Sequence, residues 1–398
     1  LPEIRWRFMT PMKNSNLGLM ATLDQGAMVT NLLPPAKEED LTDDVLKSWS
    51  DMCYTLVNEI KDITNDVEVI NEYWLTQQGD LLEMNARTYA KYLKASAEPI
   101  RKANPNANII AMCGSARGTL AKWMEYIILA LGDNPGQYFD TISVHDYMLG
   151  YGAIYPEQGI NDDIPALMEM LKKYGLEDKA VWSTEFGITS GYTKCDIDEK
   201  TKGDYHIRQA MLQNMYYGKS TIYQIAQNYG GGLSEYEDGF GVVRKPESGE
   251  IWYEALPTAL EVAAYNAIFA DSKFISRQII EDSNPASITA DDVWCYKYKL
   301  ADGKECFAVY SVENEKDASI KFGADEVTVY DEYGNKTDMS AIDGYTTIKL
   351  SKAPTYIVAD KLADSIELRD KPLFTAPGEI SMPLDDEYNF SVGNSANV

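Results

Sequence analysis

The sequence predicts an α/β fold with a parallel sheet, followed by an antiparallel β-sandwich. Strand and helix patterns alternate from about residue 17 to residue 228, which is typical of parallel α/β architectures. After about residue 272 the pattern changes to short alternating strands separated by turn residues, which indicates an antiparallel sandwich. The 398 residues allow one large domain and a smaller one.

The expected elements of the first region follow from apolar spacing and end signals. Residues 1–16 resemble the end of a helix leading into the first strand. The expected strands are short apolar runs at residues 17–23, 67–70, 108–112, 141–144, 180–183 and 220–225. The expected helices cover residues 41–62, 83–104, 120–131, 164–174, 204–217 and 253–268.

Six strands are two fewer than a (β/α)₈ barrel needs. Each strand of the series is followed by a helix, so we expect the shortage to lie before residue 17. The interpretation is therefore a TIM barrel that lacks its first two strands in this chain, with the six strands counted as the third to the eighth. A complete six-stranded sheet is the alternative.

The second region contains six further expected strands, bounded by turn signals such as the ADGK segment at residues 301–304. These strands are expected at residues 293–300, 305–312, 318–322, 327–331, 346–350 and 356–359. The predicted organisation is an N-terminally incomplete catalytic barrel domain over residues 1–271 and a β-sandwich domain over residues 272–362. Residues 363–398 are expected to be a linker or the start of a further module.

The charge balance narrows the classes of partner. There are 36 basic and 62 acidic residues, a net charge of −26, and such a surface repels phosphate backbones and anionic lipids. We therefore expect no nucleic acid partner and no membrane partner, and a neutral substrate such as a sugar. No apolar run reaches 18 residues. We expect an extracellular or cell-surface protein whose signal peptide lies outside this chain, with a cytoplasmic location left open.

Histidines and cysteines are sparse. The two histidines, His145 and His206, are too few for a histidine-rich metal site, and the five cysteines show no CxxC spacing. We expect mostly free, buried thiols; Cys295 and Cys306 flank an expected hairpin but are not expected to face one another. No metal and no organic cofactor is expected.

Two glutamates follow apolar strands in a way that indicates catalysis. The segments are VEVINEYW, which contains Glu72, and VWSTEFG, which contains Glu185. In a TIM barrel the C-terminal ends of the strands converge on one mouth. Retaining glycoside hydrolysis uses two carboxyl groups that lie about 5–5.5 Å apart. Each glutamate taken alone is better explained as a solvated residue after a strand.

A third segment, TISVHDY at residues 141–147, strengthens the interpretation. It places His145 and Tyr147 at the end of a strand that lies between the two glutamates in chain order. A tyrosine hydroxyl can orient a neighbouring carboxylate, and an imidazole can help to set its charge. A histidine at this position is also compatible with a plain core residue.

With these residues in order, the chain resembles clan A glycoside hydrolases over about residues 17–270. That clan has an Asn-Glu pair after strand 4, a His-x-Tyr pattern after strand 6 and a glutamate after strand 7. The matching residues here are Asn71-Glu72, His145-x-Tyr147 and Glu185. Within the clan, families 39 and 51, which contain β-xylosidases and α-L-arabinofuranosidases, look most similar.

The resemblance implies roles for these residues. Glu72 would be the general acid/base with a raised pKa, and Glu185 would be the nucleophile and stay ionised. Asn71 would hydrogen-bond the 2-hydroxyl of the sugar, and His145 and Tyr147 would also belong to the substrate site. Further candidates for contact with the sugar are Trp74, Trp182 and Tyr223, although plain packing explains each of them equally well.

Two departures from the clan concern the substrate more than the reaction. Strand 8 of the clan often supplies a tryptophan to the sugar, whereas STIYQI at residues 220–225 offers Tyr223 and Gln224. Strands 1 and 2, which usually contribute an arginine, are absent here. Arg5 and Arg7 are expected on the helix before the first strand, so neither is assigned to the site.

The leading function is a retaining glycosidase that acts on a polysaccharide or oligosaccharide. The alternative is a non-catalytic carbohydrate-binding or scaffold protein on a decayed barrel. An acyl hydrolase is disfavoured because no G-x-S-x-G motif surrounds Ser115 or Ser183. The Gly230–Gly232 run lacks the lysine of a P-loop and is interpreted as a flexible loop, whose acidic residues are better explained as solvated than as a Ca²⁺ site.

Overall fold

The structure is a computed structural model that describes residues 9–15, 18–24, 38, 41–73, 82–114, 119–147, 155–190, 197–226, 239–244, 253–280 and 288–369. The chain forms two compact units. The first comprises the described residues within 1–153, 159–187 and 216–223, and the second comprises those within 154–158, 188–215 and 224–398.

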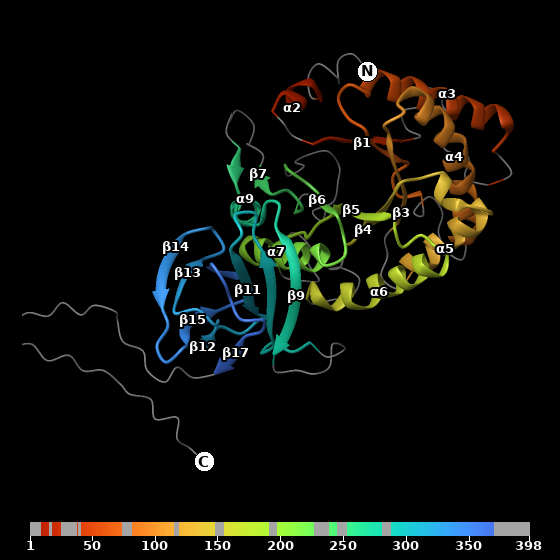
Figure 1. The fold of residues 1–398 in the computed structure, drawn as a ribbon. Helices are drawn as coiled ribbons and strands as arrows, with labels where there is room; N and C mark the ends of the chain where they lie inside the picture. Colours follow the sequence, from red (N-terminus) through yellow and green to blue (C-terminus); the bar gives the residue numbers. More distant parts are fainter. Residues whose placement is uncertain are drawn as a thin grey trace, which may run out of the picture. The chain divides into compact units, whose positions relative to one another are not determined.

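The first unit contains a six-stranded parallel sheet whose strands lie in chain order (Figure 1). The strands are β1 (Met20–Leu23), β2 (Asp66–Val69), β3 (Asn108–Gly114), β4 (Thr141–His145), β5 (Ala180–Phe186) and β6 (Lys219–Ile222). Every neighbouring pair is parallel. All of the C-terminal strand ends therefore lie at one edge of the sheet, where ligands bind in such folds.

Helices of the first unit alternate with these strands along the chain. They are α3 (Asp43–Ile60), α4 (Leu82–Ala103), α5 (Leu120–Leu131) and α6 (Glu157–Lys173), with the short α2 (Thr10–Asn14) before β1 and the 3₁₀ helix η5 (Pro135–Gln137) before β4. Thr42 caps α3 by accepting a hydrogen bond from the backbone N–H of Val45. The buried indole of Trp49 in α3 donates to Ser96 Oγ in α4 at 2.7 Å, which joins the two helices.

The second unit contains two more helices, α7 (Glu199–Asn214) and α9 (Pro257–Phe269), which pack against each other. A short antiparallel pair, β7 (Val243–Arg244) and β8 (Glu254–Ala255), precedes α9. Arg208 in α7 is fully buried and forms a two-pronged ion pair with the buried Glu157, at 2.7 Å for each hydrogen bond. Tyr205 and Tyr310 flank its guanidinium, with ring centres 4.6 and 4.8 Å away.

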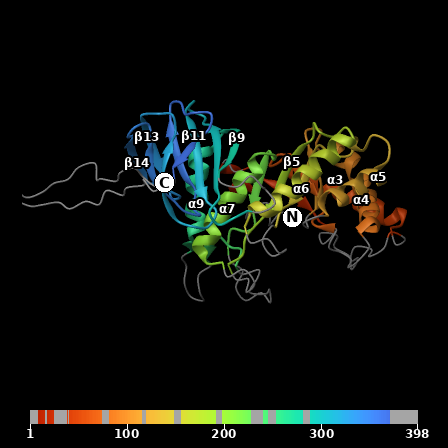
Figure 2. The same cartoon turned by 90° about the horizontal axis from the view of Figure 1, so that it is seen from below.

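Two antiparallel sheets complete the second unit. One has the order β14-β13-β16-β11-β10-β9 and the other has the order β15-β12-β17; Figure 2 shows β9, β11, β13 and β14 gathered together. The first sheet comprises β9 (Lys273–Ile280), β10 (Val293–Lys299), β11 (Glu305–Ser311), β13 (Glu326–Tyr330), β14 (Lys336–Ser340) and β16 (Thr355–Ala359). The second comprises β12 (Lys316–Lys321), β15 (Thr346–Leu350) and β17 (Glu367–Arg369).

The two antiparallel sheets share one hydrophobic core. Phe307 and Val309 come from the first sheet, and Ile320 and Leu350 come from the second. These positions alternate with polar residues along β12 and β15, as expected for strands with one buried face.

The structure confirms the predicted alternation of parallel strands and helices and the later change to antiparallel strands. The strands β7, β8, β9, β14 and β17 were not predicted, and α6 begins earlier than expected, at Glu157. The predicted domain boundaries at residues 271 and 362 stay predictions. Among the described helices, none is long and apolar enough to span a membrane.

Four cysteines, Cys53, Cys113, Cys295 and Cys306, are free and buried, as predicted. Cys295 lies opposite Val309 in the β10–β11 ladder, so it does not face Cys306. Cys195 lies outside the described residues.

Candidate active site

The C-terminal ends of β2, β4 and β5 carry the three residues that the sequence singled out. Glu72 follows β2, His145 is the last residue of β4, and Glu185 is the next-to-last residue of β5. The preceding residues of these three strands, such as Val67, Val144 and Ser183, are buried and are apolar or carry a hydroxyl group. The structure thus brings the three predicted residues together.

The turn after β2 holds Glu72 in an uncommon backbone conformation. Ile70 and Glu72 have φ values of 63° and 43°, in the left-handed region that residues with a side chain rarely adopt. For the β-branched Ile70 this is strained, and such strain gathers at functional sites. The backbone N–H of Ile70 donates to Leu23 O at 2.8 Å, which holds the turn against β1.

His145 bridges the two carboxylates. Its Nδ1 lies 3.0 Å from Glu72 Oε1 and 3.7 Å from Glu185 Oε2. One oxygen of each carboxylate and a ring nitrogen of His145 lie within 4.8 Å of one another. The imidazole is 1% exposed, whereas the side chains of Glu72 and Glu185 are 20% and 24% exposed. The carboxylates can therefore meet a ligand while the imidazole lies beneath them.

Tyr147 contacts the second glutamate. Its hydroxyl donates to Glu185 Oε1, and its ring makes an edge-to-face contact with Tyr223, with 6.3 Å between the ring centres. The backbone N–H of Tyr223 donates to Phe186 O at 2.7 Å, which fixes this residue beside the end of β5. Both predicted tyrosines therefore lie beside Glu185.

The pKa of Glu185 is raised above its ordinary value because the carboxyl is largely buried. The charge of His145 and the hydrogen bond from Tyr147 lower it, but burial outweighs them. The resemblance implies that Glu185 stays ionised, so the direction of this shift is opposite to that expectation. Burial alone would lower the pKa of His145, but the hydrogen bonds with Cys113 and Glu72 and the charge of Glu185 raise it well above its usual value.

Glu68 is a buried carboxylate that sequence reasoning missed. It is 2% exposed and accepts hydrogen bonds from the hydroxyls of Thr22, Ser143 and Thr184, at 3.1, 2.5 and 2.8 Å. Because these hydroxyls come from β1, β4 and β5, Glu68 joins four strands beneath the site. The available signal was a charged residue in the middle of an apolar strand.

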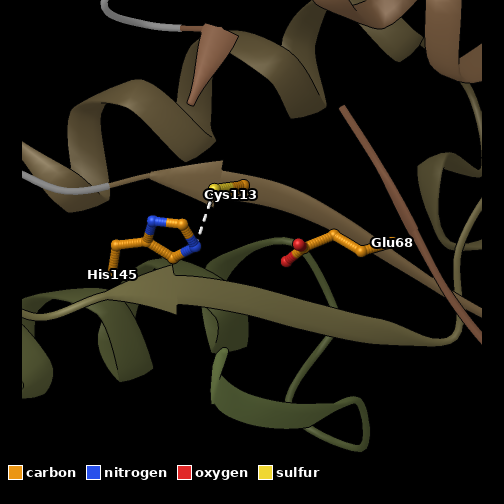
Figure 3. A group of neighbouring side chains, drawn as sticks. All are labelled: Glu68, Cys113 and His145. Carbon is orange, nitrogen blue, oxygen red and sulfur yellow. Dashed lines mark hydrogen bonds between the residues drawn. The ribbon is translucent and has the colours of Figure 1, made fainter. Parts of the chain in front are cut away.

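Cys113 was also missed as a site residue. Its Sγ lies 3.1 Å from His145 Nε2, with Glu68 alongside (Figure 3). A lone cysteine inside the apolar strand NIIAMCG gives no signal of its own beyond burial.

Two groups of side chains have the spacing of metal ligands. They are Glu68, Cys113 and His145, and Glu72, His145 and Glu185. Two ligands of a tetrahedral zinc ion, at about 2.3 Å for sulfur and 2.0 Å for nitrogen, would lie about 3.5 Å apart. The separation of 3.1 Å between Cys113 Sγ and His145 Nε2 is shorter and suits a direct hydrogen bond.

The remaining predicted residues lie at different places. Asn71 is exposed beside Glu72. Trp182 lies near the start of β5, where the Lys219 ammonium is 3.9 Å from its ring centre. Three residues of strand put it about 10 Å along the chain from Glu185, so the structure does not bring it to the glutamates. Trp74 and the Gly230–Gly232 loop lie outside the described residues.

Neither a protein-family model nor a curated protein sequence matches the chain. Solved structures do match it. A family 39 glycoside hydrolase from Bacteroides cellulosilyticus WH2 has a TM-score of 0.69 at 17% identity, over 90% of this chain and 71% of that one. A family 51 α-L-arabinofuranosidase from Bifidobacterium longum has a TM-score of 0.57 at 11% identity, over 88% and 78%.

The family 51 arabinofuranosidase from Xanthomonas axonopodis pv. citri has a TM-score of 0.53 at 12% identity, over 90% of this chain and 78% of that one. At these identities the likeness concerns the fold. The resemblance to glycoside hydrolases of families 39 and 51 that the sequence indicates is therefore confirmed in three dimensions: the chain shares their fold.

Proposed function

We propose that the protein is a retaining glycosidase that hydrolyses O-glycosidic bonds of an oligosaccharide or polysaccharide. The observation that carries the proposal is the pair Glu72 and Glu185, each with an oxygen within 4.8 Å of one oxygen of the other and both beside His145. Retaining enzymes place their carboxyl groups about 5–5.5 Å apart, whereas inverting enzymes need about 6.5–9.5 Å for a water molecule. The close spacing supports retention.

The fold supports a further part of the proposal. We interpret β1–β6 as strands three to eight of a (β/α)₈ barrel and the two C-terminal antiparallel sheets as a β-sandwich. Likeness to barrel enzymes of families 39 and 51 supports this interpretation. An α-L-arabinofuranoside or a β-xyloside is the first substrate class to test, because the chain resembles the families that contain such enzymes.

In the first step Glu185 attacks the anomeric carbon through Oε2, while Oε1 keeps the hydrogen bond from Tyr147. The glycosidic C–O bond breaks, and Glu72 gives its proton to the leaving oxygen. Oε1 of Glu72 is occupied by His145, so Oε2 is the oxygen that carries this proton. The product of this step is a glycosyl ester of Glu185.

In the second step the Glu72 carboxylate takes a proton from water, and the water oxygen attacks the anomeric carbon. The ester bond breaks and Glu185 is released as a carboxylate, which restores the starting state. Asn71 beside Glu72 is proposed to bind the sugar 2-hydroxyl, and Tyr223 beside Tyr147 is proposed to line the site.

The alternative is a non-catalytic carbohydrate-binding protein. It is not favoured, because a binding site has no need for two adjacent carboxylates, one of them raised in pKa by burial. A polymeric substrate does not cross a cell membrane, so an extracellular or cell-surface location fits the proposed substrate, and further modules of the same polypeptide are compatible with it.

The experiment uses 4-nitrophenyl glycosides, beginning with the α-L-arabinofuranoside and the β-D-xylopyranoside. Glu185→Ala should abolish turnover, and added azide should restore it and give a glycosyl azide of inverted configuration. Glu72→Ala with azide should give the retained configuration, because azide then attacks the glycosyl ester. Normal turnover by Glu185→Ala, or an inverted sugar from the wild type, would sink the proposal.

A further inference from the structure

Three contacts close a ring around Glu72. Its backbone N–H donates to Cys113 Sγ at 3.4 Å, and Cys113 Sγ lies 3.1 Å from His145 Nε2. His145 Nδ1 in turn lies 3.0 Å from Glu72 Oε1. The backbone and the carboxylate of one residue are thus joined through a thiol and an imidazole, both 1% exposed.

The end of β3 is shaped to put the sulfur at this point. The β3–β4 register shifts between Ala111 and Gly114, so Met112 and Cys113 stand opposite one residue of β4. Met112 has a φ of 72°, and its N–H donates to Tyr89 Oη at 2.8 Å. Tyr89 donates to Val69 O at 2.9 Å, so one hydroxyl bridges the ends of β2 and β3.

Gly114 permits this arrangement. A Cβ at this position would lie 2.4 Å from the ring of Trp123, which packs against the end of β3. The indole N–H of Trp123 donates to Met112 O at 3.2 Å. The bulge that carries Cys113 is therefore held from both sides.

The sulfur acts through hydrogen bonds in this setting. Burial raises the pKa of Cys113, so the group is a thiol at neutral pH and a poor nucleophile. When His145 is an imidazolium, its Nε2–H donates to the sulfur; when it is neutral, the S–H donates to Nε2. In both states Nδ1 carries a hydrogen and points at Glu72.

We propose that Cys113 is a positioning residue for Glu72, which it holds through its sulfur contacts to the Glu72 backbone and to the His145 ring. The sulfur keeps Nδ1–H on Oε1 of Glu72, which leaves Oε2 for the leaving oxygen of the substrate. This inference rests on the proposed function, because the leaving oxygen exists only in a glycosidase.

A core thiol with no positioning role would be replaceable by any small apolar group. Cys53 in α3 provides that comparison, since it is fully buried and lies 3.8 Å from Ser96 Oγ, on a helix rather than at the strand ends. The matched set is therefore Cys113→Ala, Cys113→Ser and the control Cys53→Ala.

The kinetic readout is kcat/KM on aryl glycosides with leaving groups from phenol to 2,4-dinitrophenol. Because a phenol needs protonation by Glu72, Cys113→Ala should lose about tenfold on the phenyl glycoside and about twofold or less on the dinitrophenyl glycoside. Cys113→Ser keeps a hydrogen-bonding atom and should recover most of the loss. Cys53→Ala should lose equally on both substrates or not at all.

A second readout does not depend on turnover. The chain has two histidines, so ¹⁵N spectra contain two imidazoles, and His206 in α7 serves as an internal reference. Cys113→Ala should shift the Nε2 resonance of His145 and leave His206 unchanged. An unchanged His145 resonance, or an equal loss of activity on every leaving group, would overturn the positioning role.

The two readouts separate the two proposals. A wild type without activity on any aryl glycoside, together with a shifted His145 resonance in Cys113→Ala, would reject the glycosidase and the role in its reaction while leaving the sulfur–imidazole contact in place. An active wild type whose leaving-group dependence is untouched by Cys113→Ala would reject the positioning role alone.

Discussion

His145 and Glu185 are direct partners in the register of β4 and β5, and the step that makes them partners skips one residue of β5. Val144 lies opposite Ser183, and the next pair is His145 with Glu185, so Thr184 is the additional residue. An extra residue of this kind bends a strand and re-aims its side chains. Two consecutive residues of β5 thereby contribute to one site, because Thr184 donates to Glu68 while Glu185 lies beside His145.

The first prediction concerns Glu72. Glu72→Ala should lower kcat/KM on a phenyl glycoside by about 10²- to 10⁴-fold, the usual contribution of general acid catalysis. A 2,4-dinitrophenyl glycoside should lose far less, since its leaving group departs without a proton. Steady-state rates on a series of aryl glycosides measure how steeply kcat/KM depends on the pKa of the leaving group. A uniform loss would mean that Glu72 does not protonate the leaving group.

The second prediction concerns pH. The hydrogen bond from Tyr147 lowers the pKa of Glu185, opposing the rise caused by burial. Tyr147→Phe removes that bond, so the carboxyl should hold its proton to higher pH. Because Glu185 must be ionised to attack, the acidic limb of the kcat/KM profile should move to higher pH.

Tyr223→Phe is the matched control for this shift, because Tyr223 contacts the ring of Tyr147 while the bond to Glu185 comes from Tyr147. The acidic limb of the kcat/KM profile of Tyr223→Phe should stay at the wild-type pH, even if the KM of this variant changes. An unmoved limb in Tyr147→Phe would show that the hydroxyl does not stabilise the ionised form of Glu185.

The third prediction concerns stability and Glu261 in α9. Burial, with the nearby Asp204 charge, raises the pKa of this carboxyl to about 9, although Lys200 opposes the shift. The folded protein therefore keeps a proton that the unfolded chain releases above its ordinary pKa of 4.5. The free energy of unfolding should then fall as pH rises from about 5 to about 9.

Glu261→Gln replaces the carboxyl with an amide that does not titrate. The free energy of unfolding of this variant should therefore fall less between about pH 5 and about pH 9. Denaturant titrations at pH 5, 7 and 9 compare the two proteins. Parallel pH dependences in wild type and Glu261→Gln would contradict the assignment of the proton to this residue.

The fourth prediction concerns the buried ion pair of Arg208 and Glu157. Arg208→Met leaves the Glu157 carboxylate buried without its cation, which should lower the free energy of unfolding by about 3–5 kcal/mol. The double variant Arg208→Met/Glu157→Gln removes both charges and should recover part of this loss. Urea unfolding of the three proteins measures the difference, and a double variant less stable than the single one would contradict it.

Regular elements could be predicted from the sequence because their signals are local. The helix α5 has the bounds expected from its apolar spacing, Leu120–Leu131. The strand β14, in contrast, reads Lys-Thr-Asp-Met-Ser and is mostly exposed at a sheet edge, so no apolar alternation marks it. The strand β14 forms because β13 offers backbone groups for hydrogen bonding, and nothing in the sequence of β14 indicates that pairing.

The site could be predicted only in part for a related reason. Glu72, His145 and Glu185 could be found because each lies at or just after the end of an apolar strand. Cys113 depends on the register shift in β3, and a bulge has no reliable signature in a single sequence. Trp182 was a candidate because its aromatic ring could contact a sugar. It lies about 10 Å along β5 from Glu185, so it is not beside the glutamates.

The register irregularities divide the parallel sheet into two levels. They fall after Ala111, Val144 and Ser183, at similar heights in three successive strand pairs. Below this height the ladders are regular; above it a single pair remains in each ladder, Gly114 with Val144, His145 with Glu185 and Phe186 with Ile222. Substitutions above the irregularities can therefore change what the sheet binds while the residues below them still form the sheet. New binding specificities can arise in this way without a change of fold.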